Sequence, residues 1–290
     1  MTEKFNKCKK NSRKIVTILL VSLLLTGCET DISVFDNYEI PLSQSSEQDI
    51  SEGTTADNID SEFLSADICV VPKKKQSQKD SFMTAGASLI FDNTHNKMLY
   101  ADNIYTKMYP ASTTKIVTAL VALKYGNLND EVTISYNATH INEYGAKLCG
   151  FAEGDKLTLK KLLYSFLICS GNDAGIAIAE HIAGSVDKFA AMMNKEVKAL
   201  GCSGSNFVNP HGLHDDNHYT TPYDLYLVFH ELLKYDVFMD IINHSSYKAE
   251  FNGADGNKKT LWFTSTDKYL LGSAKAPEGV TVIGGKTGTT

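Results

Sequence analysis

Three short polar motifs, in order along the chain, hold the residue types that acyl transfer requires. Ser112 lies three residues before Lys115, Ser170 lies two before Asn172, and Lys286 opens a Lys-Thr-Gly string. A serine hydroxyl becomes a nucleophile when a neighbouring amine accepts its proton, and a second lysine can bind a carboxylate. The set predicts acyl transfer on a substrate that ends in a carboxylate.

The Ser-x-x-Lys motif occurs twice, so its surroundings decide between the copies. Ser112 follows a Tyr-Pro-Ala string and precedes apolar residues with a period of 3.6, which predicts the first turn of a buried helix ending near Gly126. Residues three apart share a helix face, so the Lys115 amine can approach the Ser112 hydroxyl. The second copy, Ser245 to Lys248, has no helical pattern after it. We therefore assign the nucleophile to Ser112.

The base, Lys115, must be uncharged part of the time, because an ammonium group cannot accept the serine proton. Burial beside Ile116 and Val117 and the second cation Lys286 are both expected to lower the pKa of Lys115. The free backbone amides of the helix start could stabilise an oxyanion.

The second motif, residues 170–172, separates two apolar segments that predict buried helices. Polar side chains placed there would face an otherwise apolar layer and need partners, which indicates an active-site wall. Capping of the next helix by the same residues stays open as a further role. The other Ser-x-Asn copy, at Ser135, is expected in an exposed loop.

The third motif follows residues 281–285, whose β-branched side chains and glycines predict a strand with an open edge. A substrate could lie along that edge while Lys286 and Thr287 hold its carboxylate.

Three histidines near two aspartates form a further candidate cluster. Such a density of ligands is compatible with a metal site, but their Gly- and Asn-containing loop favours structural packing, so we predict no metal. The residues are His211, His214, His218, Asp215 and Asp216.

The charge of the chain is uneven along its length. The 290 residues carry a formal net charge of −6, yet residues 29–72 hold eleven acids and no Lys or Arg, and residues 73–290 are neutral. A neutral body without a basic stripe argues against nucleic-acid binding.

The first 28 residues read as an export signal that takes no part in the fold. A basic start precedes the apolar stretch 15–25, which is too short to span a bilayer, and Leu-Thr-Gly-Cys28 resembles a bacterial lipobox. Cys28 would then carry the lipid. Residues 29–80 are polar and acidic and predict a disordered tether. The catalytic domain is expected over residues 81–290.

The domain opens with two short apolar runs, 87–92 and 97–101, around a turn-type cluster, which predicts a β-hairpin. Four cysteines follow the expected cleavage site without metal-type spacing, and their pairing cannot be read from the sequence. They are Cys69, Cys149, Cys169 and Cys202; small buried residues are the favoured reading of Cys149 and Cys169.

From about residue 81 the chain resembles the serine-type D-Ala-D-Ala carboxypeptidases, the low-molecular-mass penicillin-binding proteins. The resemblance implies an α/β (α+β) fold of the β-lactamase/transpeptidase type: an antiparallel sheet flanked by helices, with a helical subdomain. It rests on the strings Tyr109-Pro110-Ala111-Ser112-Thr113-Thr114-Lys115, Ser170-Gly171-Asn172-Asp173-Ala174, Asn209-Pro210-His211-Gly212-Leu213 and Gly285-Lys286-Thr287-Gly288-Thr289-Thr290.

The resemblance also implies roles for the motif residues. Ser112 would be acylated by the penultimate D-Ala, Lys115 would be its general base, and Ser170 would relay a proton to the leaving D-Ala. The implied substrate-binding residues are Asn172 for the amide, Lys286 and Thr287 for the terminal carboxylate, and Thr289, whose N–H would join that of Ser112 in the oxyanion hole.

The implied partners are peptidoglycan stem peptides ending in D-Ala-D-Ala, β-lactam antibiotics as inhibitors, and the extracytoplasmic face of the bacterial membrane, reached through the lipid anchor. No cofactor, metal or nucleic acid is expected.

Two alternative functions stay open, and the chain differs from the family in one respect. A serine β-lactamase shares the fold, but the chain has no Glu-x-x-Leu-Asn string for a deacylating water. A non-catalytic wall-binding or β-lactam-sensing lipoprotein is the other alternative. The family implies two further strands and a helix after Lys-Thr-Gly, so we expect a C-terminally truncated chain with a sheet lacking central members. The expected function is that of the intact parent, and the sequence leaves the activity of the truncated chain open.

Overall fold

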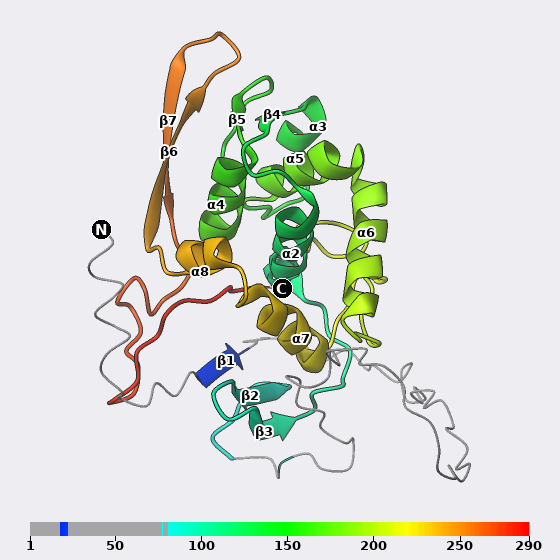
Figure 1. Ribbon diagram of the computed structural model, residues 1–290, viewed down its shortest axis with the longest axis vertical. Coiled ribbons are helices and arrows are strands. Elements are labelled where there is room, and N and C mark those ends of the chain that lie inside the picture. The colour runs from blue at the N-terminus through cyan, green and yellow to red at the C-terminus, as the bar shows by residue number, and fades with distance from the viewer. Residues whose placement is uncertain (1–17, 23–76, 78–80, 290) are drawn as a thin grey trace, which may run out of the picture.

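The computed structural model describes residues 18–22, 77 and 81–289. Most of the expected leader, the Cys28 lipidation site and the tether over 29–80, except Ser77, lie outside the described residues. The elements of the described part are shown in Figure 1.

A group of buried helices forms the largest layer. Apolar side chains on α2 and α4 are buried almost throughout, because each packs against neighbouring helices on several sides. The helix α7 begins where the Thr221 hydroxyl accepts the Asp224 N–H and Pro222 occupies the first turn. The α-helices are α2 (Lys115–Tyr125), α3 (Tyr136–Thr139), α4 (Leu159–Cys169), α5 (Asn172–Ala183), α6 (Val186–Ala199), α7 (Pro222–Leu232) and α8 (Asp236–Ile242).

Two antiparallel sheets flank the helices, which confirms the predicted fold class. The predicted hairpin forms β2 and β3, and β6 and β7 make a long hairpin beside α4 (Figure 1). The first sheet has the order β1-β2-β3, with β1 (Ile18–Ser22), β2 (Ser88–Asp92) and β3 (Lys97–Asp102); the second has the order β4-β5-β6-β7, with β4 (Glu131–Thr133), β5 (Lys156–Thr158), β6 (Ser246–Asn252) and β7 (Lys258–Thr264).

Strand β1 differs from the expectation that the leader takes no part in the fold. Its residues pair antiparallel with β2, from Ile18 opposite Asp92 to Ser22 opposite Ser88. An unpaired edge of β2 offers free backbone N–H and C=O groups, and an apolar segment rich in β-branched and Leu residues can satisfy them. Only a targeting role was predicted for this segment.

Two local predictions were wrong. Residues 281–289 form no strand, because no other strand of the described part pairs with them. Ser135, expected in an exposed loop, caps the short helix α3: its hydroxyl accepts the Ala138 N–H and donates to Glu180 at 2.5 Å. A serine can cap a helix of a single turn. Such a short helix shows no periodic pattern in the sequence.

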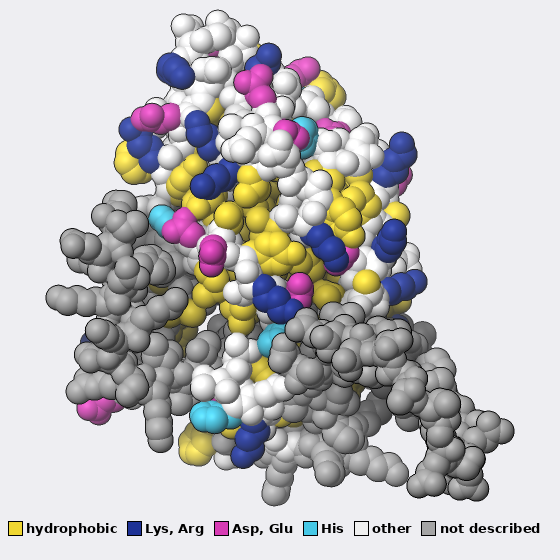
Figure 2. All heavy atoms as spheres, viewed as in Figure 1, with side chains coloured by type: hydrophobic (Ala, Val, Ile, Leu, Met, Phe, Trp, Pro, Cys, Tyr) yellow, Lys and Arg dark blue, Asp and Glu magenta, His cyan; other side chains and the backbone are white. Residues whose placement is uncertain are grey.

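The hydrophobic core lies between the helices and reaches the inner face of both sheets. Figure 2 shows apolar side chains exposed in the middle of one face, with basic and acidic side chains interspersed around them. Among the described residues, no helix combines the length and apolar character needed to cross a bilayer. Large core side chains include Phe91, Leu120, Phe166, Phe189, Phe207, Tyr226 and Phe238.

Candidate active site

Ser112 lies in a tight turn that leads into α2. Residues Ala111–Thr114 form a 3-10 turn in which Thr113 donates from its N–H and its hydroxyl to the Pro110 carbonyl, at 3.1 and 2.6 Å. Ala111 has φ of 45°, a left-handed conformation that side-chain-bearing residues rarely adopt. Such strain is held only where the surroundings fix it and is frequent at functional sites.

The Asn209–Leu213 loop fixes this turn from outside. Gly212 has φ of 90°, and a methyl group built on it would lie 1.8 Å from the Ala111 carbonyl oxygen, so only glycine fits. Asn209 organises the loop: its side-chain oxygen accepts from the Gly212 N–H at 2.7 Å, and its amide donates to the Leu213 carbonyl at 2.9 Å.

Lys115 is fully buried and its amine contacts three oxygen atoms. The Nζ atom lies 3.0 Å from Ser112 Oγ, 2.8 Å from Asn172 Oδ1 and 2.7 Å from the His211 carbonyl oxygen. The predicted approach of Lys115 to Ser112 is thus present. Asn172 joins the same amine, which brings the first two motifs together.

This set of partners orients the lone pair of a neutral Lys115. The Asn172 and His211 oxygens are carbonyl acceptors, so each takes one of the two N–H bonds of a neutral amine. The remaining sp³ position, which holds the lone pair, then faces Ser112 Oγ. The Ser112 hydroxyl can donate its proton there.

The surroundings favour the neutral form of Lys115. Burial lowers the pKa of Lys115 well below its ordinary value, and the charge of Lys286 lowers it further. The ring of Phe166 lies 5.6 Å from Nζ and forms part of the apolar surroundings. Burial and the charge of Lys115 also lower the pKa of His211 to about 3, which keeps that imidazole neutral. Both causes predicted for Lys115 operate in the structure.

Ser170 combines two unusual features. It ends α4 in the left-handed region, with φ of 66°, and its buried Oγ has no hydrogen-bond partner among the described residues. A buried orphan hydroxyl costs stability and is rare unless it serves a function. Ser170 is therefore a candidate for a group whose partner arrives with the substrate.

Residues 147–151, which we call the 147–151 segment, are held by hydrogen bonds against the connection between α4 and α5. We call this set of contacts the clamp. The Asn172 N–H donates to the Lys147 carbonyl at 2.7 Å, and the Asp173 carboxylate accepts the N–H groups of Cys149 at 2.8 Å and Gly150 at 2.9 Å. A methyl group on Gly171 would lie 2.4 Å from the Cys149 sulfur, so the contact requires glycine. This clamp was not predicted, although Asp173, an acid in the first turn of α5, is visible in the sequence.

The Lys-Thr-Gly string lies against Ser112. A methyl group built on Gly288 would lie 3.3 Å from the Ser112 nitrogen and 3.1 Å from the Pro110 carbonyl oxygen. Figure 1 shows the last residues of the chain passing beside the end of α2 where this turn begins. All three motifs therefore meet around one serine.

Lys286 and Thr287 of this string each donate one side-chain hydrogen bond. Lys286 Nζ donates to the Thr287 carbonyl at 2.7 Å, and Thr287 Oγ1 donates to Thr266 Oγ1 at 2.6 Å. Burial and the charge of Lys147 lower the pKa of Lys286 to about 7. Thr289 is exposed.

The second Ser-x-x-Lys copy lies at the start of β6, away from the Ser112 turn. Ser245 precedes β6 and its carbonyl accepts the Ser265 N–H at 2.8 Å, while Lys248 forms an ion pair with Glu250 at 2.5 Å. Neither residue is near a helix start, so this copy lacks the helical frame that surrounds Ser112.

The histidine loop packs as predicted. His218 is buried; its Nδ1 accepts the Val208 N–H at 3.1 Å, so Nε2 carries the proton and donates to Thr114 Oγ1 at 2.8 Å. The His211 carbonyl accepts a hydrogen bond from Lys115 Nζ. Across the described residues, no group of three or more His, Cys, Asp or Glu is arranged to hold a metal ion.

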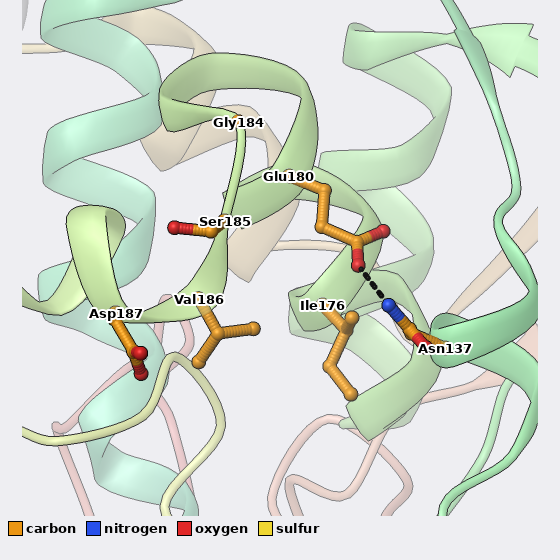
Figure 3. A pocket seen from close by; sticks show the side chains of 7 residues that line it. All are labelled: Asn137, Ile176, Glu180, Gly184, Ser185, Val186 and Asp187. Carbon is orange, nitrogen blue, oxygen red and sulfur yellow. Dashed lines mark hydrogen bonds between the residues drawn. The ribbon is translucent and has the colours of Figure 1, made fainter.

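A surface cavity of about 300 Å³ lies at the opposite end of α5 from Asn172 (Figure 3). One of its two carboxylates, Glu180, accepts from Ser135 and from Asn137, so it is already engaged in structural hydrogen bonds. This cavity is separate from the site around Ser112. It is lined by Asn137, Ile176, Glu180, Gly184, Ser185, Val186 and Asp187.

Comparisons with known proteins agree with this geometry. Residues 73–290 match the family described as D-alanyl-D-alanine carboxypeptidase, Peptidase S11. The chain is 34% identical over 191 residues to the D-alanyl-D-alanine carboxypeptidase DacF of Bacillus subtilis, covering 64% of this chain and 47% of that protein. It is 33% identical over 181 residues to DacA of Escherichia coli, covering 58% of this chain and 44% of that protein. The chain thus spans less than half the length of these relatives.

Among solved structures, the Streptomyces K15 DD-transpeptidase is similar with a TM-score of 0.66 and 28% identity, covering 74% of this chain and 83% of that one.

Proposed function

Because the chain belongs to the D-alanyl-D-alanine carboxypeptidase family, Peptidase S11, we propose that it removes the terminal D-alanine from peptidoglycan stem peptides ending in D-Ala-D-Ala. The observation that carries this proposal is the buried Lys115 amine, whose two carbonyl acceptors leave its lone pair facing Ser112 Oγ at 3.0 Å. The reaction proceeds through an ester between Ser112 and the peptide.

In the acylation step, Lys115 accepts the proton of Ser112 as Oγ attacks the carbonyl carbon of the penultimate D-Ala. The bond between this carbon and the nitrogen of the last D-Ala then breaks, and that nitrogen takes up a proton as D-alanine leaves. The free hydroxyl of Ser170 is the proposed relay for this proton. Water then hydrolyses the ester and restores Ser112.

The other motif residues bind the substrate. Lys286 and Thr287 hold the terminal carboxylate, and Asn172 binds the peptide amide while it also orients Lys115. The N–H groups of Ser112 and Thr289 form the oxyanion hole. Since the pKa of Lys286 is about 7, a bound carboxylate would raise it and hold the ammonium form.

A β-lactam presents a strained amide to the same serine. Attack opens the ring and forms an ester, but the leaving nitrogen stays tethered to the acyl group. We therefore propose that β-lactams acylate Ser112 as inhibitors.

We further propose that the enzyme works at the extracytoplasmic face of the bacterial membrane, held by a diacylglycerol on Cys28. The basic start, the short apolar stretch and the lipobox-like string support this location. Peptidoglycan substrates lie on that side of the membrane.

Release of D-alanine separates the proposed function from its alternatives. The protein is incubated with a diacetylated tripeptide ending in D-Ala-D-Ala, and with the same tripeptide ending in L-Ala-L-Ala, and free alanine is measured. We expect release from the D,D peptide alone, and none from a Ser112→Ala variant. Rapid turnover of penicillin without D-alanine release would indicate a β-lactamase, and a stable penicillin adduct without peptide hydrolysis would indicate a sensor.

A further inference from the structure

Two thiols meet directly behind the second motif. Cys169 is the last residue of α4 and precedes Ser170, Cys149 is the centre of the 147–151 segment, and their sulfur atoms lie 3.2 Å apart. Both are free thiols in the structure. From this contact we propose that Cys149 and Cys169 are a disulfide site, and that the bond fastens the 147–151 segment to the corner that carries Ser170 and Asn172.

The backbone around the two thiols already holds them in place. The Asp173 carboxylate accepts the Cys149 N–H at 2.8 Å, and the Asn172 N–H donates to the Lys147 carbonyl at 2.7 Å. A disulfide needs a sulfur separation of about 2.05 Å, so closure requires an approach of roughly 1.2 Å. Because the clamp holds the backbone on both sides, this approach is left to the two side chains.

The electrostatics of the pair favour exchange. The hydrogen bond between the two sulfur atoms lowers the pKa of Cys169, with help from the Gly171 N–H, whereas burial raises the pKa of Cys149. A thiolate is the nucleophile of thiol–disulfide exchange, so Cys169 is the better attacking group of the two.

The bond forms by two exchanges with an external disulfide, R–S–S–R, of the thiol–disulfide oxidoreductase or low-molecular-mass class. One cysteine thiolate attacks R–S–S–R, forms a mixed disulfide and releases R–S⁻. The second cysteine thiolate attacks the protein sulfur of that mixed disulfide, closes the bond and releases another R–S⁻. The two thiol protons pass to these thiolates, so two cysteines are oxidised and R–S–S–R is reduced to two R–SH.

An oxidising compartment keeps such a bond formed. This part of the inference rests on the extracytoplasmic location given under the proposed function. The bond would join residues 20 positions apart and restrict the unfolded chain, which stabilises the folded state. It would also prevent the 147–151 segment from leaving the Ser170 corner when the protein is heated.

Peptide mapping tests the cross-link without any assay of activity. The full chain is incubated with oxidised glutathione, free thiols are then alkylated, and the non-reduced digest is analysed by mass spectrometry. We expect one linked peptide that joins Cys149 to Cys169, while Cys202, which is buried and donates to the Asp224 carbonyl, is alkylated only after unfolding. Alkylation of both Cys149 and Cys169, a lasting glutathione adduct on either one, or a link from either one to another cysteine would overturn the proposal.

Thermal unfolding supplies the second readout. Dithiothreitol, or the Cys149→Ser or Cys169→Ser substitution, is expected to lower the melting temperature of the oxidised protein by roughly 5–10 °C. The matched control, Cys202→Ala, should keep the same shift on reduction. A melting temperature that dithiothreitol leaves unchanged in the wild-type protein contradicts the cross-link.

The two proposals fail separately. If the linked peptide is found but neither D-alanine release nor penicillin acylation occurs, the cross-link stands and the proposed function is wrong. If D-alanine is released and no linked peptide forms, the cross-link is wrong and the proposed function stands.

Discussion

Replacement of Lys115 by arginine is expected to reduce acylation of Ser112 by penicillin roughly a thousandfold, the scale of a lost general base. A guanidinium group stays protonated near neutral pH and cannot accept the serine proton. Lys286→Arg keeps the positive charge that we propose attracts the substrate carboxylate and changes mainly the geometry of the contact, so the acylation rate should fall only about tenfold. The contrast between the two variants tests the role of each lysine.

The measurement is the second-order rate of acylation across pH, with folding checked by circular dichroism. Because the pKa of Lys115 is lowered, its neutral form persists to lower pH than an ordinary lysine would allow. The wild-type rate should therefore fall as pH drops through this lowered pKa, where the amine becomes protonated. Greater activity in Lys115→Arg than in Lys286→Arg would show that Lys115 is not the base.

A second variant separates catalysis from folding. Arginine at position 115 would bury a permanent charge among apolar residues and is expected to destabilise the fold. Lys115→Met fills a similar volume without a charge, so it should fold and yet acylate as slowly as Lys115→Arg. A folded Lys115→Met variant with near-normal acylation would contradict the mechanism.

Replacement of Ser170 by alanine is expected to slow acylation about a hundredfold while the protein stays at least as stable as the wild type. The Ser170 Oγ is buried without a partner among the described residues, so its removal relieves a desolvation cost of about 1–3 kcal/mol. The loss of rate follows from the proposed role of this hydroxyl, which is to relay the proton to the leaving nitrogen. Activity and stability should thus change in opposite directions, as is common at active sites.

Ser165 is the matched control for this variant. It is a buried serine in the same helix α4, but its hydroxyl donates to the Lys161 carbonyl at 2.9 Å. Ser165→Ala should lose about 1 kcal/mol of stability and keep the wild-type rate of acylation. Urea denaturation and stopped-flow acylation of both variants provide the comparison. A Ser170→Ala variant that loses stability and keeps its rate would make Ser170 a structural residue.

The parts of the site that local sequence determines were predictable. The three-residue spacing of Ser112 and Lys115 requires only one helical turn, and the structure has it. The Ser-Gly-Asn break between two apolar helices was equally local. The two apolar runs and the turn residues between them identified the β2–β3 hairpin for the same reason.

The parts that depend on long-range contacts were not predictable. The third partner of Lys115 is a backbone carbonyl 96 residues away, at His211, and a carbonyl has no residue-type signature. The thiol contact of Cys149 and Cys169 arises from the clamp around Asp173, which no spacing rule describes. Residues 281–285 have strand-like composition, but a strand also needs a partner, and composition cannot supply one.

The most direct test of the central claim is the residue that penicillin acylates. The protein is treated with labelled penicillin, denatured to trap the ester, digested and mapped by mass spectrometry. The proximity of Lys115 Nζ to Ser112 Oγ predicts one adduct, on Ser112, and its loss in Ser112→Ala. An adduct on Ser245, beside the second Ser-x-x-Lys copy, or one that persists in Ser112→Ala, would contradict the account.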